Sequence, residues 1–182
     1  MKKSLLSALF LMLCLVGFGQ AKFPPLKLRN TLIVSHLDKQ ADQFSLEIAV
    51  SDVLSNLKVK NMVSLNLLKA GGDPQVLMTD SVAKLLTTKG INTMMLVSVR
   101  GFDNRFKPSS GNMTLAEDLA ADNLFPIYKD DISSVTFEFH FYREGKLVYT
   151  DLLKIGGGIS SRDKVLRKLR KKLAKKVLKD WV

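Results

Sequence analysis

Two histidines, His36 and His140, are the residues of this sequence best suited to acid–base chemistry near neutral pH. His36 lies two residues before Asp38, and a carboxylate can orient an imidazole that acts as a base. A hydrolase would also need a serine nucleophile, yet no Gly-x-Ser-x-Gly turn places one beside this pair. We therefore interpret both histidines as ordinary strand residues and expect no catalytic residue and no enzymatic activity.

The same residues also make a poor metal site. Catalytic zinc usually takes three protein ligands, often including two histidines close together in the sequence, whereas His36 and His140 are far apart. The acidic pair Asp130–Asp131 is best interpreted as a solvated turn. Cys14 is the single cysteine, and it lies inside the amino-terminal apolar run. We expect no metal ion and no cofactor.

A glycine-rich stretch, Gly156-Gly-Gly-Ile-Ser-Ser161, precedes the last predicted helix and superficially resembles a phosphate-binding loop. The Gly-Lys-Ser/Thr of a P-loop is absent, and the chain contains no Gly-x-Gly-x-x-Gly. We expect these glycines to release the chain from a strand, with Ser160 capping the helix that follows.

The last predicted helix, residues 160–182, carries most of the excess charge. From Arg162 onward there are ten Lys and Arg against two acidic residues, whereas the rest of the chain after the amino-terminal lysines has 16 against 15. Apolar residues recur at helical spacing on one side of this helix. The opposite side is the candidate anion- or partner-binding surface: Lys164, Lys168, Lys171, Lys172, Lys175 and Lys179.

Two interpretations of these six lysines remain open. They can be the solvated face of a helix that packs its apolar side on the core. They can also be a binding surface for an anionic lipid headgroup or an acidic partner. Lysines four residues apart repel each other by about 0.2–0.5 kcal/mol per pair at low salt, and an anionic partner would turn that repulsion into attraction.

The amino terminus has the pattern of a secretory signal peptide. Lys2 and Lys3 precede an apolar run from Leu5 to Phe18, and small residues follow it. The run is shorter than the ~20 residues that a transmembrane helix needs. We predict a signal peptide over residues 1–21, cleaved after Gln20 or Ala21, and one domain over residues 22–182 without cysteine.

Hydrophobic periodicity predicts an α/β domain. Strands are expected over Thr31–Leu37, around Val63–Leu67, over Met94–Val99, and in a hairpin that turns at Glu144-Gly145. Helices are expected over Asp42–Lys58, from Asp73 or Asp80 to Gly90, and over residues 160–182. A long connection, Gly101–Asp131, contains a capping box at Thr114 and Glu117. The order β-α-β-α-β-loop-β-β-α implies a mixed sheet of about five strands with helices packed on it.

A resemblance supports this architecture. Leu32-Ile-Val-Ser35, the segment Lys89–Val99 and the hairpin Phe137–Leu153 with its following helix resemble a small α/β domain of the bacterial envelope. That domain occurs in the amino-terminal part of TolB, in curli-secretion lipoproteins and in lipoprotein activators of peptidoglycan synthases. The resemblance covers roughly Asn30 to Trp181. The lipid-bearing cysteine of that group is absent here, and Tyr149 stands where tryptophan is commoner.

Members of the resembled group are scaffolds and binders. The resemblance and the leader together imply an exported protein, located in the periplasm or at the outer membrane, that associates with another envelope protein without catalysis. The alternative is a peripheral binder of anionic lipid or lipopolysaccharide that uses the basic last helix. An exported protein rarely meets nucleic acid, so we expect none as a partner, and no transmembrane segment after cleavage.

Overall fold

The structure is a computed structural model that describes residues 24–68, 72–107, 113–122 and 124–182. The predicted signal peptide and Cys14 lie outside the described residues. Within these residues six strands form one sheet: β1 (Asn30–His36), β2 (Lys60–Val63), β3 (Met94–Phe102), β4 (Arg105–Phe106), β5 (Ser134–Arg143) and β6 (Lys146–Gly156). The helices are α2 (Gln40–Asn56), η1 (Ser64–Asn66), η2 (Pro74–Met78), α3 (Asp80–Thr88), α4 (Leu115–Leu119), α5 (Arg162–Lys176) and η3 (Val177–Trp181).

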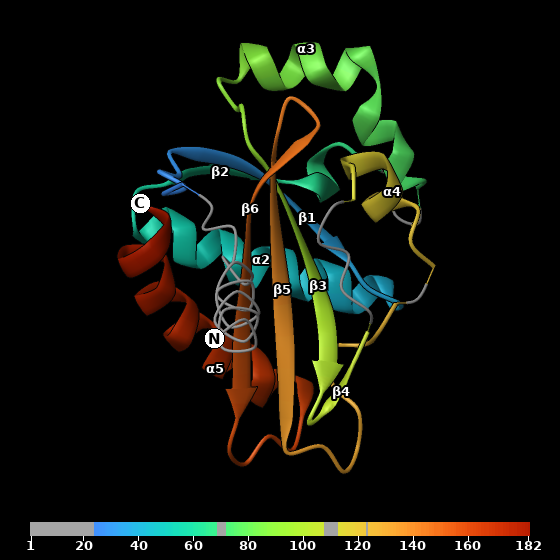
Figure 1. The fold of residues 1–182 in the computed structure, drawn as a ribbon, viewed down its shortest axis with the longest axis vertical. Helices are drawn as coiled ribbons and strands as arrows, with labels where there is room; N and C mark the ends of the chain where they lie inside the picture. The colour runs from blue at the N-terminus through green and yellow to red at the C-terminus, as the bar shows by residue number, and fades with distance from the viewer. Residues whose placement is uncertain (1–23, 69–71, 108–112, 123) are drawn as a thin grey trace, which may run out of the picture.

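The strand order is β2-β1-β3-β5-β6, with the short β4 paired to β3. Strands β1, β2 and β3 are parallel to one another, whereas β5 and β6 are antiparallel. The two crossovers that join the parallel strands run through α2 and through η2 with α3 (Figure 1). The expected α/β class and mixed sheet are confirmed.

Each face of the sheet has its own apolar core. The phenylalanines of β5 lie on the face covered by α2 and α5, and Phe137, Phe139 and Phe141 are fully buried there. The other face is covered by η2, α3 and α4, and its core includes Leu32, Leu96 and Tyr142. We call these the α2/α5 face and the α3/α4 face.

Helix α5 has an apolar stripe at spacing four: Val165, Leu169, Leu173, Val177 and Trp181 are all fully buried. Each step of four residues advances about 40° around an α-helix, so the stripe should drift away from the sheet. The last turn, η3, is a π-helix. Its wider turn offsets the drift and returns Trp181 to the core, where its ring packs edge-on against Phe139 and Phe141.

Three local expectations are corrected. Strand β2 ends at Val63, and Ser64–Asn66 forms a 3-10 turn where the alternation of Val63 and Leu65 predicts a continuing strand. The capping residue of α5 is Ser161, whose hydroxyl accepts the Lys164 amide hydrogen, rather than Ser160. The third correction is an unexpected strand, β4, which lies within the long connection after β3.

The rest of that connection is tied to the domain at separate points. Its capping box at Thr114 and Glu117 opens α4 as expected. Ile127 is fully buried, and its amide donates to the carboxylate of Asp42 at the start of α2. The side chain of Asp103 accepts hydrogen bonds from the backbone amides of Ser133 and of Ser134, the first residue of β5.

Candidate functional site

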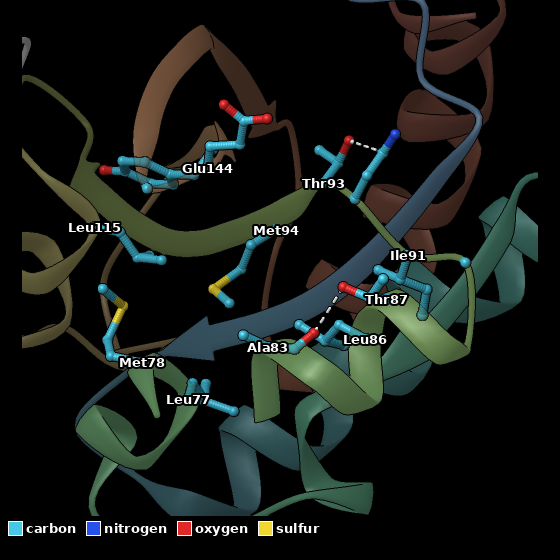
Figure 2. Close-up of a pocket in the computed structure, with 14 residues that line it drawn as sticks. Leu77, Met78, Ala83, Leu86, Thr87, Ile91, Thr93, Met94, Leu115 and Glu144 are labelled. Atoms are coloured by element: carbon cyan, nitrogen blue, oxygen red, sulfur yellow. Dashed lines mark hydrogen bonds between the residues drawn. The ribbon is translucent and has the colours of Figure 1, made fainter. Parts of the chain in front are cut away.

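A cavity of about 570 Å³ opens between α3 and the amino-terminal end of β3. Helix α3 forms one wall with Ala83, Leu86 and Thr87, and Met94 of β3 faces it across the opening (Figure 2). The hairpin between β5 and β6 contributes Glu144 at the rim. The apolar side chains that line this pocket are Leu77, Met78, Leu86, Ile91, Met94 and Leu115.

One apolar side chain of the pocket lining reaches the molecular surface: Met78 of η2 is 42% exposed. Val76 of η2 and Leu85 of α3 are also exposed, but neither lines the cavity. Glu144 is the only charged residue in the lining of this cavity as the structure describes it. A pocket of this size with few polar groups suits an apolar side chain or small apolar ligand, and methionines adapt their shape to what they contact.

Beside this pocket, a buried cluster of charged side chains connects α4 to β5. It consists of Asp118, Glu138 and His140. Asp118 of α4 accepts hydrogen bonds through Oδ2 from His140 Nδ1 at 2.5 Å and from the Tyr142 hydroxyl at 2.7 Å. The other imidazole nitrogen, Nε2, lies 3.3 Å from the Glu138 carboxylate. Glu138 in turn lies 3.8 Å from the guanidinium of Arg100 on β3.

In this cluster the charged forms of His140 and Asp118 stabilise each other and shift both pKa values. Burial lowers the pKa of His140, but its hydrogen bonds to Asp118 and Glu138 outweigh burial and raise that pKa to about 9. Burial raises the pKa of Asp118, and the hydrogen bonds from His140 and Tyr142 outweigh it, so the net shift is downward. At neutral pH His140 is therefore a cation that donates from both ring nitrogens. In this state it has no free lone pair with which to accept a proton.

The cluster positions one wall of the apolar pocket. Leu115 of α4 and Tyr142 of β5 both line the cavity, and Asp118 binds the Tyr142 hydroxyl and the neighbouring His140. The five-residue helix α4 is also held by Gln75, whose side-chain Nε2 donates to the Ala116 carbonyl at 3.1 Å. The ionic contacts thus fix the distance between α4 and the sheet.

A second, polar cavity of about 490 Å³ lies at the carboxyl end of β1, with His36 in its wall. Open α/β sheets commonly bind ligands at such an edge, where the crossovers reverse direction. Glu47, also in the wall, is bound entirely by protein groups: it accepts from Ser35, from the Ser64 hydroxyl and from the Leu65 amide. Burial raises the pKa of Glu47 and lowers that of His36.

Although the two histidines are distant in sequence, His36 lies close to the cluster that contains His140. In the sheet register His36 pairs with Ser98, and Ser98 pairs with Glu138 on the next strand. The described residues contain no group of three or more His, Cys, Asp or Glu side chains arranged to hold a metal ion.

The six candidate lysines of the last helix do not form one uniform surface. Three of them contact protein oxygens: Lys164 Nζ donates to the Ser160 hydroxyl at 2.7 Å, Lys172 Nζ to the Lys154 carbonyl at 3.0 Å, and Lys168 Nζ to the carbonyls of Gly156 and Gly157. Lys171, Lys175 and Lys179 are exposed and have no hydrogen bond or ion pair with the residues the structure describes.

The contacts of Lys168 and Lys172 protect an edge of the sheet. Strand β6 is a terminal strand, and an open strand edge invites pairing with another chain. The two lysines cover carbonyl groups along this edge. Asp151 adds to the protection, because its carboxylate accepts from the Leu152 amide and is held by Trp181 and Lys176.

Sequence reasoning did not find the apolar pocket or the Asp118–His140 cluster. The lining of the pocket comes from η2, α3, β3, α4 and β5, which are spread over almost 70 residues. One signal was available for the cluster: His140 and Tyr142 are polar residues on the same side of a strand whose other side carries Phe137, Phe139 and Phe141. Such a pair on a covered sheet face requires a buried polar partner.

Comparisons with known proteins place this fold among distant neighbours only. No protein-family model matches the sequence, and no curated protein gives a significant match. Some solved structures are similar to this chain, but their sequence identities and TM-scores are too low to assign a family.

The first neighbour is a PelC dodecamer from Paraburkholderia phytofirmans, with 11% sequence identity and a TM-score of 0.44 over 85% of this chain and 93% of that chain. The second is the lipoprotein GNA1162 from Neisseria meningitidis, with 12% identity and a TM-score of 0.42 over 83% of this chain and 97% of that chain. Within the part of the chain that the structure describes, no helix has the length and apolar character needed to span a membrane.

Proposed function

We propose that this chain is an exported, non-catalytic accessory protein of the bacterial cell envelope that binds another envelope protein. The observation that carries the binding role is the apolar pocket, which opens to the surface beside the exposed side chain of Met78. A recessed apolar pocket at a protein surface is a common receptor for an anchoring aromatic or aliphatic side chain. Export rests on the amino-terminal leader, and the resembled TolB-like group consists of binders, which agrees with this role.

The absence of catalysis is part of the same proposal. His140, one of the two histidines, is buried, and both of its nitrogens are occupied by carboxylates. A catalytic base must reach the substrate with a free lone pair. The cluster instead holds α4 against the sheet and so gives the pocket a fixed shape.

Photo-crosslinking in intact cells would test the pocket. A photoreactive residue at Thr87, on the pocket side of α3, should yield one defined adduct, and the same residue at Ser81, on the opposite side of that helix, should not. Substitution Ala83→Trp should fill the cavity and abolish the Thr87 adduct, because the partner's anchor side chain can no longer enter.

The matched control is Ser81→Trp, which adds the same side chain to α3 away from the pocket. Both variants should melt within a few degrees of the unmodified protein. Equal adducts from positions 81 and 87, or an adduct that persists in Ala83→Trp, would show that the pocket is not the binding site.

A further inference from the structure

The outer side of α5 has a composition that differs from that of an ordinary solvated helix. Lys171, Lys175 and Lys179 are four residues apart, which is about one turn, so they lie on the same side of α5 and η3. The exposed Leu178 of η3 and Val182, which follows η3, are close in the chain to the last of these lysines. Leu178 is 61% exposed and Val182 is 56% exposed, so neither belongs to the buried core. We call these five residues the α5 outer face. Figure 1 shows α5 along one flank of the molecule, at the lower left of the view.

The charges of this face lack neighbouring acids. The acidic groups around α5 are already paired with other cations: Asp42 and Asp163 with Arg162, Asp52 with Arg170, and Asp151 and Asp180 with Lys176. Among the described residues, no acidic side chain lies within ion-pair distance of Lys171, Lys175 or Lys179. The face therefore presents uncompensated positive charge next to exposed apolar side chains.

We propose that the α5 outer face docks this protein on an anionic phospholipid surface. Lysines attract the phosphate groups of the surface, and their long stems can extend to the headgroups while Leu178 and Val182 enter the acyl boundary. An acidic protein would satisfy the lysines, but it would leave the two exposed apolar side chains unexplained. Compared with the lipid-binding alternative predicted from the sequence, Lys164, Lys168 and Lys172 are excluded from the contact because they bind protein oxygens, and Leu178 and Val182 are added.

Co-sedimentation with vesicles tests the proposal. The protein should bind mixed phosphatidylcholine/phosphatidylglycerol vesicles and not pure phosphatidylcholine vesicles, and added salt should weaken binding. The triple variant Lys171→Gln, Lys175→Gln, Lys179→Gln should lose roughly fivefold affinity per lysine and about 100-fold in all. The matched control, Lys84→Gln, Lys89→Gln, Lys146→Gln, removes the same charge from exposed positions near the pocket and should change affinity only a few-fold.

Substitution Leu178→Asn separates a membrane from an acidic protein surface. It leaves the charge unchanged and should weaken vesicle binding roughly tenfold at low and at high salt. Unchanged binding by Leu178→Asn, equal loss in the two lysine variants, or no binding by the unmodified protein would each overturn the proposal. The pocket variant Ala83→Trp should bind vesicles normally, so failure of the pocket and failure of the α5 outer face are distinguishable.

Discussion

At the scale of single residues, the Asp118–His140 pair shows how a buried charge can be stabilised by its partners. Burying an isolated ion is costly, so buried charges are found paired and hydrogen-bonded. His140 has a carboxylate at each ring nitrogen, and Asp118 receives a second hydrogen bond from Tyr142. Removing one partner would therefore leave an uncompensated charge inside the protein rather than a neutral gap.

This pair predicts a pH dependence of stability on the alkaline side. The folded pKa of His140 is about 9, above the unfolded value of about 6.5, so folding favours the protonated form. Its contribution is complete below about pH 6.5 and is lost as the pH rises through 9. The free energy of unfolding should fall by about 3 kcal/mol over this interval, as measured by urea unfolding at several pH values.

The control for this prediction is His140→Gln, which cannot be protonated. It should be less stable than the unmodified protein near pH 6 and should lack the His140-dependent part of the alkaline decrease. If the two proteins lose stability in parallel between about pH 6 and pH 9, the histidine is not the group that carries the charge.

At the scale of elements, the β5 strand is the centre of the larger core. Phe139→Ala should destabilise the protein by about 3–5 kcal/mol, because its ring is fully buried and packs on Trp181. For a domain of this size that corresponds to a fall of roughly 10 °C in Tm. Thermal melting followed by circular dichroism would measure it.

Phe44→Ala provides the comparison within the same chain. Phe44 lies on α2 but is 55% exposed, so removing its ring should cost less than about 1 kcal/mol. Similar shifts in the two variants would mean that the phenylalanines of β5 face away from the core.

Most of the elements were predictable because their patterns are long. The alternation of β5 covers eight residues, from Val135 to Tyr142, and the apolar stripe of α5 covers four turns, so each pattern repeats often enough to identify its element. The segment after β2 shows where prediction from periodicity fails. Val63 and Leu65 satisfy a strand pattern, but the carboxylate of Glu47 binds the Ser64 hydroxyl and the Leu65 amide and favours a 3-10 turn there. A hydrogen bond across 17 residues leaves no periodic trace in the sequence.

One of the candidate sites could be predicted from the sequence and the other could not. The lysines of the last helix were visible as a local pattern of charge, although the sequence could not separate Lys168 and Lys172, which cover the β6 edge, from the lysines that face solvent. The apolar pocket was not visible. Its walls are brought together only by the crossover that places α3 over the amino end of β3.

At the scale of the whole molecule, the pocket and the α5 outer face lie on opposite faces of one sheet. Helix α5 belongs to the core of the α2/α5 face, whereas the pocket is built on the α3/α4 face. If both proposals hold, the protein can lie on a membrane through one side and present its pocket to a partner on the other.

Export is the prediction on which the location of the whole molecule depends. The protein recovered from the cell envelope should begin after Gln20 or Ala21, since the apolar run ends there and small residues precede the site. Amino-terminal sequencing of the purified envelope form would determine it. Recovery of a cytosolic protein that still begins with Met1 would contradict export and the envelope role together.

The position of the sequence's single tryptophan has a practical consequence. Trp181 is fully buried between two phenylalanine rings, and its indole N–H donates to Asp151, so its fluorescence emission should be blue-shifted while α5 is packed on the sheet. Unfolding would shift that emission to the red. Contact of Leu178 with vesicles, three residues away, would leave it largely unchanged. Intrinsic fluorescence should therefore separate docking of the intact protein on lipid from loss of its fold, without any attached label.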